Sequence, residues 1–110
     1  MRRYTALKPS KGTTWPPAVS AAIRARDVDC VGPRIGMAGD CLGERAIDHI
    51  RASHGMGMKS PSTVENGALL CNVHHVLKTE NGKTWRPKLI AYIASKEREA
   101  EWAEIDEAMG

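Results

Sequence analysis

The sequence predicts a small α+β domain: a β-hairpin with a long connection, followed directly by a short helix, with flanking helices and a structural metal site. Two short segments with alternating or apolar character, residues 44–50 and 67–71, are typical of strands. Three cysteines and four histidines supply metal ligands. A chain of 110 residues without Phe buries a limited core, so a bound metal ion would stabilise it.

The N-terminal part divides into an arm and a helix. Residues 1–16 are basic, contain Pro and Gly and show no apolar period, so we expect a flexible basic arm. Residues 17–27 suit a short helix, because Pro17 is tolerated in the first turn and an apolar face follows it. Residues 28–43 carry five residues of Gly or Pro and are expected to form a loop that returns Cys41 towards Cys30.

The central part should form the hairpin and its helix. In the first strand, Asp48 and His49 are neighbours, so their side chains point to opposite faces. Residues 51–64 form the connection and carry His54, which could reach a metal or a phosphate, although a loop histidine is more often simply exposed. After the second strand, residues 72–79 suit a short helix with Asn72 as its N-cap.

The C-terminal part should be a turn and a helix. We expect the turn at residues 80–86 and a helix that begins at Pro87 and runs to about residue 108. The domain proper is then residues 17–96, and residues 97–110 are the acidic end of the last helix.

The charge is unevenly distributed. The net charge of +3 combines +8 over residues 1–96 with −5 over residues 97–107. A basic body fits a protein that binds a polyanion, and it fits a solvated surface equally well. No apolar run approaches the length of a membrane span, and no secretory signal follows Met1, so we expect a cytoplasmic protein without a membrane partner.

The cysteines point to zinc. Cys71-x-x-His74 has the spacing of half a zinc site, and Cys30 and Cys41 can supply the other half. Four such ligands leave no open position, so this zinc would be structural. Free thiols are the alternative, as is His75 in place of His74, because both histidines lie about one turn after Cys71.

The remaining polar residues suggest a reactive site. Asp48 and His75 could bind one divalent ion and leave it open positions, which suits phosphate chemistry. His49 could then accept a proton from water. Asn66 could hold the His49 ring through a side-chain hydrogen bond and so fix its tautomer.

Together these residues resemble the HNH endonuclease motif, in particular that of small bacteriophage proteins. The family pattern is Asp-His-Ile, a loop, an Asn before an apolar strand, and then Leu-Cys-x-x-Cys-His-x-x-Lys-Thr. His74 stands where the family usually has a second Cys, and the long gap between Cys30 and Cys41 replaces the family's C-x-x-C. The matching segments are Asp48-His49-Ile50, Glu65-Asn66-Gly67-Ala68-Leu69-Leu70-Cys71 and His74-His75-Val76-Leu77-Lys78-Thr79.

The resemblance implies a ββα-metal fold and a metal-dependent nuclease that hydrolyses DNA phosphodiester bonds to 5′-phosphate and 3′-hydroxyl ends. It implies His49 as general base, Asn66 as its orienter, and Asp48 with His75 as ligands of the catalytic ion, which in this family is Mg²⁺, Mn²⁺ or another divalent ion. A phage nuclease of this kind can act with terminase subunits in genome packaging, in the cytoplasm of the host cell. The alternative is a non-catalytic zinc module that binds DNA or protein. The expected phosphate contacts are Arg51, Lys78, Lys83 and Arg86.

Overall fold

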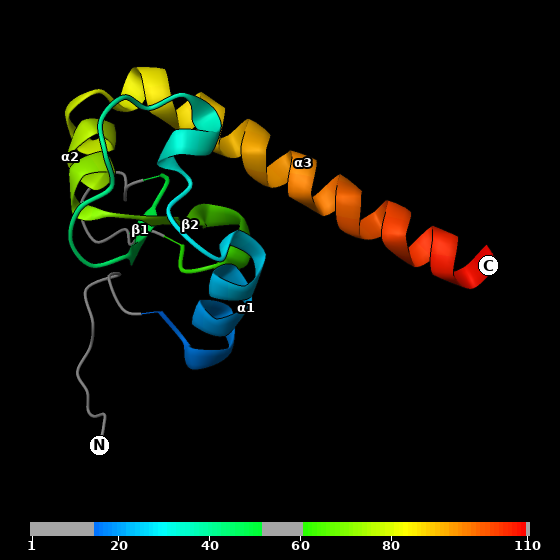
Figure 1. Cartoon of the computed structure of the whole chain (residues 1–110). Coiled ribbons are helices and arrows are strands. Elements are labelled where there is room, and N and C mark those ends of the chain that lie inside the picture. The colour runs from blue at the N-terminus through cyan, green and yellow to red at the C-terminus, as the bar shows by residue number, and fades with distance from the viewer. Residues whose placement is uncertain (1–14, 52–60, 110) are drawn as a thin grey trace.

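A computed structural model describes residues 15–51 and 61–109 of the chain. A β-hairpin packs between a helix that precedes it in the sequence and two consecutive helices that follow it, as Figure 1 shows. Of the basic arm predicted at residues 1–16, only Trp15 and Pro16 are among the described residues, and His54 also lies outside them. The elements are α1 (Pro17–Asp27), β1 (Ala46–His49), β2 (Gly67–Leu70), α2 (Asn72–Glu80) and α3 (Gly82–Met109), with 3-10 turns at Gly32–Ile35 and Val64–Asn66.

The predicted hairpin is confirmed, with strands of four residues each. β1 and β2 pair antiparallel, with Ala46 opposite Leu70 and His49 opposite Gly67. All of β2 is buried, whereas burial in β1 varies from residue to residue and Asp48 is the one buried residue of that strand. A strand that is apolar along its whole length is expected where both faces are covered, and β2 indeed contacts α1 and α2.

The core lies where the hairpin meets the helices. Ile23 of α1, Ile50 after β1, Leu70 of β2 and Leu89 of α3 are almost completely buried. Burial of each such side chain contributes about 1.5–3 kcal/mol to stability. Cys30 and Cys71 belong to one apolar cluster with Ile50, Leu70 and Leu89, so two of the predicted metal ligands are part of the core.

One buried carboxylate joins three of the elements. Asp27, fully buried at the end of α1, accepts hydrogen bonds from the guanidinium of Arg26, from the backbone N–H of Leu69 and from the hydroxyl of Tyr92. A buried charge needs such partners, because an unpaired one costs several kcal/mol. Asp27 thus fixes α1 to β2 and to α3.

The boundaries of the last two helices correct the sequence-based expectation. The N-cap of α2 is Cys71, whose sulfur accepts from the backbone N–H of His74, and Asn72 is the first helical residue. The expected turn at 80–86 is mostly helical, because α3 begins at Gly82. Pro87 therefore lies inside α3, in its second turn, where the missing N–H removes a single backbone hydrogen bond.

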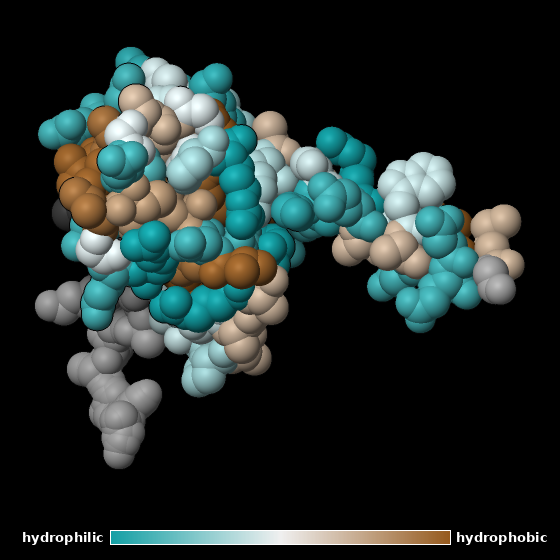
Figure 2. All heavy atoms as spheres, in the orientation of Figure 1, coloured by the Kyte–Doolittle hydropathy of each residue, from teal (hydrophilic) through white to brown (hydrophobic). Residues whose placement is uncertain are grey.

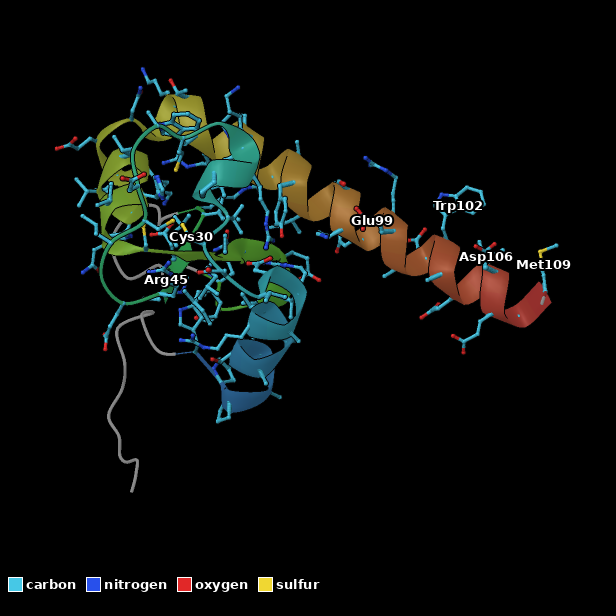
Figure 3. The ribbon with its side chains drawn as sticks, viewed as in Figure 1. Cys30, Arg45, Glu99, Trp102, Asp106 and Met109 are labelled. Carbon is cyan, nitrogen blue, oxygen red and sulfur yellow. The ribbon has the colours of Figure 1, made fainter. Side chains whose placement is uncertain are left out.

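The C-terminal half of α3 projects from the body, as Figure 1 shows. Its exposed side chains include Trp102 and Met109, with 64% and 82% of their surface accessible. Figure 3 shows both on the projecting segment, and Figure 2 shows that hydrophilic residues predominate there. Within the described residues, no helix combines the length and the apolar character that crossing a bilayer requires.

Candidate metal centre and the adjoining histidines

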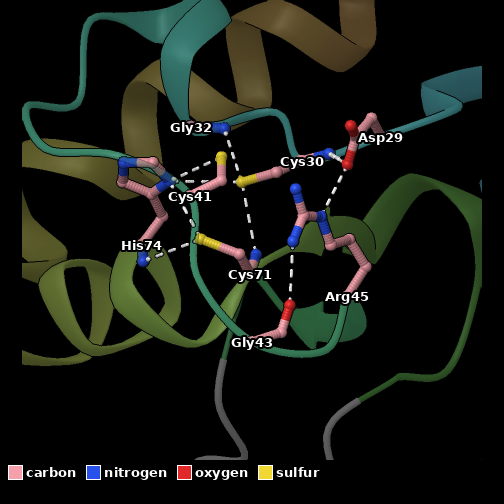
Figure 4. Close-up of polar contacts among 8 residues, drawn as sticks. All are labelled: Asp29, Cys30, Gly32, Cys41, Gly43, Arg45, Cys71 and His74. Atoms are coloured by element: carbon pink, nitrogen blue, oxygen red, sulfur yellow. Dashed lines mark hydrogen bonds and ion pairs between the residues drawn. The ribbon is translucent and has the colours of Figure 1, made fainter.

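Three thiols and one imidazole converge beside the hairpin. The ligand atoms of Cys30, Cys41, Cys71 and His74 all lie within 4.8 Å of one another. The Nδ1 atom of His74 is 3.3, 3.6 and 3.2 Å from the sulfurs of Cys30, Cys41 and Cys71. Figure 4 shows the four side chains pointing toward a common centre. The predicted ligand set is therefore confirmed as a cluster, and three sulfurs with one nitrogen suit tetrahedral zinc.

Backbone N–H groups are directed at the sulfurs. Gly32 and Cys71 donate to the sulfur of Cys30 at 3.4 and 3.2 Å, and His74 donates to the sulfur of Cys71 at 3.5 Å. Such donors stabilise thiolate charge, which is the form that binds metal. Cys71 serves twice, as N-cap of α2 and as ligand, so the start of the helix is fixed to the cluster.

The imidazole of His74 is held from its far side. Its Nε2 atom lies 3.1 Å from the carbonyl oxygens of Ala38 and of Gly39, so Nε2 carries the proton and donates it. This tautomer leaves the Nδ1 lone pair free to bind a metal. The ring also packs on Gly32, where an added Cβ would lie 2.5 Å from Cγ of His74.

A charged pair supports the loop that carries Cys30. Asp29 accepts from the backbone N–H of Cys30 and from Nε of Arg45, both at 2.7 Å, and Arg45 donates in turn to the carbonyl of Gly43 at 2.8 Å. The hydrogen bond from Arg45 holds the pKa of Asp29 below its ordinary value. These contacts join two segments that the sequence separates by the glycine-rich loop.

The thiols differ in acidity. Burial opposes ionisation of Cys71, but backbone hydrogen bonds from His74 and Leu42 and bonds with Cys30 and Cys41 outweigh it and lower the pKa of Cys71 to about 6. Burial, together with the neighbouring thiols, raises the pKa of Cys41 to about 11. Three thiols in contact share their protons in this way, and a bound cation would favour the thiolate form of all three.

His75 faces the other way, towards the hairpin. Its Nδ1 atom lies 2.8 Å from Oδ1 of Asp48, and 54% of its side chain is exposed, compared with 7% for Asp48. The alternative in which His75 replaces His74 at the zinc cluster is therefore wrong. Adjacent residues on a helix point about 100° apart, so His74 of α2 faces the cysteines while His75 faces Asp48.

Lys78 lies next to the same carboxylate, which contradicts its predicted role as a phosphate contact. Its ammonium is 2.9 Å from Oδ2 of Asp48 and donates to the backbone carbonyl of His49 at 2.6 Å. Only 9% of the Lys78 side chain is exposed, so DNA cannot reach it. Within the described residues, Oδ2 of Asp48 is buried and accepts no hydrogen bond, so its contact with Lys78 is one of charge.

The side chain of His49 points to the opposite face of β1, as predicted. Its Nε2 atom lies 3.0 Å from the hydroxyl of Ser62, and its ring stacks on Trp15. Burial lowers the pKa of His49, the charge of Asp48 opposes this shift and that of Lys78 adds to it. A lowered pKa keeps the imidazole neutral at pH 7 and able to accept a proton.

Asn66 does not hold the His49 ring, contrary to the prediction. Its amide accepts from the backbone N–H of Arg51 at 2.9 Å and donates to the carbonyls of Arg51 and Pro61 at 3.2 and 2.8 Å. All the hydrogen-bonding capacity of the amide nitrogen is used in this way. Asn66 thus fastens the segment that follows β1 to the segment that precedes β2.

The other basic residues divide by exposure. Arg51 and Lys83 are exposed and remain available for phosphate. Arg86 is half-buried and donates from Nε to the carbonyl of Ile50 at 3.0 Å, so part of its guanidinium supports the hairpin. Trp15 and Ser62 were missed by the sequence-based reasoning, although an aromatic residue before two prolines was a signal that residue 15 is held in place.

Asp48 and His75 offer two of the ligand types that a catalytic cation would need. Oδ1 of Asp48 and Nδ1 of His75 lie 2.8 Å apart, and a divalent ion accepts such a pair of donors, whereas Oδ2 of Asp48 faces the ammonium of Lys78 at 2.9 Å. Within residues 15–51 and 61–109, no third Cys, His, Asp or Glu joins these two. The pair therefore fits an ion that keeps most of its positions for water and substrate.

Comparisons with known proteins identify no relative of the chain. No protein-family model, no curated protein and no solved structure matches the chain.

Proposed function

We propose that this chain is a divalent-metal-dependent endonuclease of the HNH type, which hydrolyses phosphodiester bonds of DNA on a ββα scaffold stabilised by zinc. The observation that carries the proposal is the approach of His75 Nδ1 to Asp48 Oδ1, at 2.8 Å. Asp48 is the neighbour of His49 in the sequence, and His75 is the neighbour of His74, the proposed zinc ligand. The HNH resemblance gives these residues the same roles.

The proposed chemistry uses both faces of β1. A divalent ion bound by Asp48 and His75 would stabilise the charge that develops on the phosphate and on the leaving oxygen. His49, on the other face, accepts a proton from water while the water oxygen forms a bond to phosphorus. The bond from phosphorus to the 3′-oxygen breaks, and that oxygen takes up a proton from solvent, which leaves a 5′-phosphate and a 3′-hydroxyl.

DNA would be bound mainly through its phosphates. The charge of +8 over residues 1–96 provides the attraction, and exposed Arg51 and Lys83 are candidates for contact with the DNA phosphates. Binding of this kind has little sequence preference and weakens steeply with salt. The resemblance extends the proposal to a phage protein that acts with terminase subunits in the host cytoplasm.

A second candidate is a zinc-stabilised module that binds DNA or protein without catalysis. The observation in its favour is the ammonium of Lys78, which lies 2.9 Å from Oδ2 of Asp48 and already supplies a positive charge there. In this reading the carboxylate is a structural partner of Lys78 and His75, and no second cation is required.

A plasmid assay separates the two candidates. Supercoiled plasmid is incubated with the zinc-loaded protein in Mg²⁺ or in Mn²⁺, with EDTA as a metal-free control. The nuclease should nick the plasmid only with the added ion, and His49→Ala should reduce the rate about 100-fold or more, as expected for loss of a general base.

Thr84→Ala, an exposed change on α3 outside the motif, is the control and should cut like the wild type. Circular dichroism and zinc content should be the same for all three proteins. Equal cutting by wild type and His49→Ala would indicate a contaminating nuclease and would reject the proposal, as would a folded, zinc-loaded wild type that never cuts.

A further inference from the structure

The imidazole of His49 is held on two sides by residues without an assigned role. Its Nε2 atom lies 3.0 Å from the hydroxyl of Ser62. Its ring stacks on the indole of Trp15, with the ring centroids 4.2 Å apart and the planes inclined by 19°. These two contacts act on different degrees of freedom, since the hydrogen bond selects which ring nitrogen points to Ser62 and the stack fixes the plane of the ring.

The strand opposite His49 is shaped to receive the indole. Gly67 faces His49 across the hairpin. A Cβ at Gly67 would lie 2.7 Å from Cη2 of Trp15 and 2.6 Å from Cδ1 of Ile23, closer than real Cβ atoms approach. The backbone of Gly67 is ordinary extended strand, so glycine is needed here for space and not for conformation. The indole of Trp15 therefore occupies space that is free only because residue 67 has no side chain.

The hydroxyl of Ser62 is also held in place. Asn66 donates to the carbonyl of Pro61, the residue before Ser62, and its backbone N–H donates to the carbonyl of Thr63, the residue after it. The same amide accepts from the backbone N–H of Arg51, just beyond β1. Asn66 thus sets the distance between the end of β1 and the segment that carries Ser62, and its influence on His49 passes through that segment.

We propose that Trp15 and Ser62 are positioning residues for His49. Trp15 fixes the plane of the imidazole, and Ser62 fixes which of its two nitrogens faces the Ser62 hydroxyl. As part of this proposal we assign the ring proton to Nε2, which then donates to the Ser62 hydroxyl and leaves Nδ1 to accept a proton. The effect on cutting rests on the proposed nuclease function, whereas the orientation of the ring does not. A terminal ring torsion is otherwise broad, so an unheld imidazole samples orientations in which neither nitrogen faces the substrate.

The first test is kinetic. Ser62→Ala and Trp15→Ala should each lower kcat about tenfold to 100-fold with KM nearly unchanged, because misplacing a reacting group by about 1 Å has effects of this size. Ser62→Thr keeps the hydroxyl and Trp15→Phe keeps a stacking ring, so these conservative variants should recover most of the rate. Wild-type kcat in both alanine variants would overturn the proposal.

The second test does not need activity. Nitrogen-detected NMR of ¹⁵N-histidine-labelled protein, zinc-loaded and without added divalent ion, reports which nitrogen of neutral His49 carries the proton. The wild type should show the Nε2–H form, and Ser62→Ala should show a mixture of the two tautomers. An Nδ1–H form in the wild type, or an identical spectrum in Ser62→Ala, would overturn the proposal.

The two tests together separate this inference from the proposed function. If the wild type does not cut DNA, the nuclease proposal fails and the NMR spectrum alone decides the orientation of the ring. If the wild type cuts and the alanine variants cut equally well, the nuclease proposal stands and the positioning role is rejected. Zinc content and circular dichroism identify any variant that fails to fold. If Trp15→Ala fails to fold, the comparison of Ser62→Ala with the wild type decides, because Ser62 lies in a segment outside the core.

Discussion

His74 and His75 are adjacent in the sequence and have opposite surroundings. His74 is fully buried, with Nδ1 within 3.6 Å of three sulfurs and Nε2 held by backbone carbonyls. His75 is half exposed and meets a single carboxylate. The first belongs to a cluster of four candidate metal ligands, and the second contacts Asp48 alone among the acidic residues that the structure describes.

Under the nuclease proposal, this difference would let a small domain combine stability with reactivity. A closed metal centre in the core supplies folding energy, because its ligands are brought together only in the folded chain. A half-exposed histidine contributes less to stability, and under the nuclease proposal His75 would leave positions on a bound ion free for chemistry. In this chain a single helix, α2, carries one histidine of each kind.

The largest expected effect comes from the buried histidine. His74→Ala, like Cys71→Ser, should abolish zinc binding and unfold the domain, because structural zinc contributes about 10–16 kcal/mol in small domains and a chain of this size has about 5–15 kcal/mol to lose. Elemental analysis should find one zinc per chain in the wild type and none in the variants, with loss of helical circular dichroism. A variant that stays folded without metal would show that the cluster is dispensable.

The neighbouring histidine should behave in the opposite way. His75→Ala should keep one zinc per chain and change the free energy of unfolding by less than about 1 kcal/mol, because more than half of the removed side chain is exposed. Under the nuclease proposal its cutting rate with Mg²⁺ or Mn²⁺ falls about 100-fold or more. If His75→Ala instead loses zinc and folding, the two histidines are not separate in function, and the contrast between them fails.

The last comparison sets a buried lysine against an exposed one, by urea unfolding and by binding to DNA, and the exposed lysine has the smallest expected effect. Lys78→Met leaves Asp48 without its cationic partner and should cost about 3–5 kcal/mol, the usual range for breaking a buried pair. Lys83→Ala, at an exposed position, should leave stability unchanged and reduce the slope of log K against log salt by about 0.9 if it contacts one phosphate. A stable Lys78→Met variant with a reduced salt slope would restore Lys78 as a DNA contact.

The sequence was sufficient where short-range geometry decides the outcome. The alternation of β1 placed Asp48 and His49 on opposite faces, and the helical spacing from Cys71 to His74 indicated a half-site for zinc, as the structure bears out. The hairpin and α2 lie within one or two residues of their expected bounds. These features depend on neighbours in the chain, which the sequence displays directly.

Contacts between distant segments could not be predicted in this way. Ser62 reaches His49 across the long connection, and Trp15 reaches it from before α1, so neither pairing has a spacing rule. Asn66 was assigned to the right neighbourhood and the wrong partner, because a side-chain amide can satisfy several backbone groups as well as a ring. Lys78 was taken as a surface cation because burial of its stem and head depends on the tertiary packing of α2.

Cys71 is both the N-cap of α2 and a member of the candidate metal cluster. It therefore fixes the direction in which each side chain of that helix points. Each added or removed residue turns a helix by about 100°. A one-residue insertion between Cys71 and His74 would therefore carry Val73 towards the sulfurs and move both histidines off their partners at once. Many single substitutions in α2 are compatible with both sites, but changes in its length are compatible with neither, so the segment should tolerate variation in composition far better than insertion or deletion.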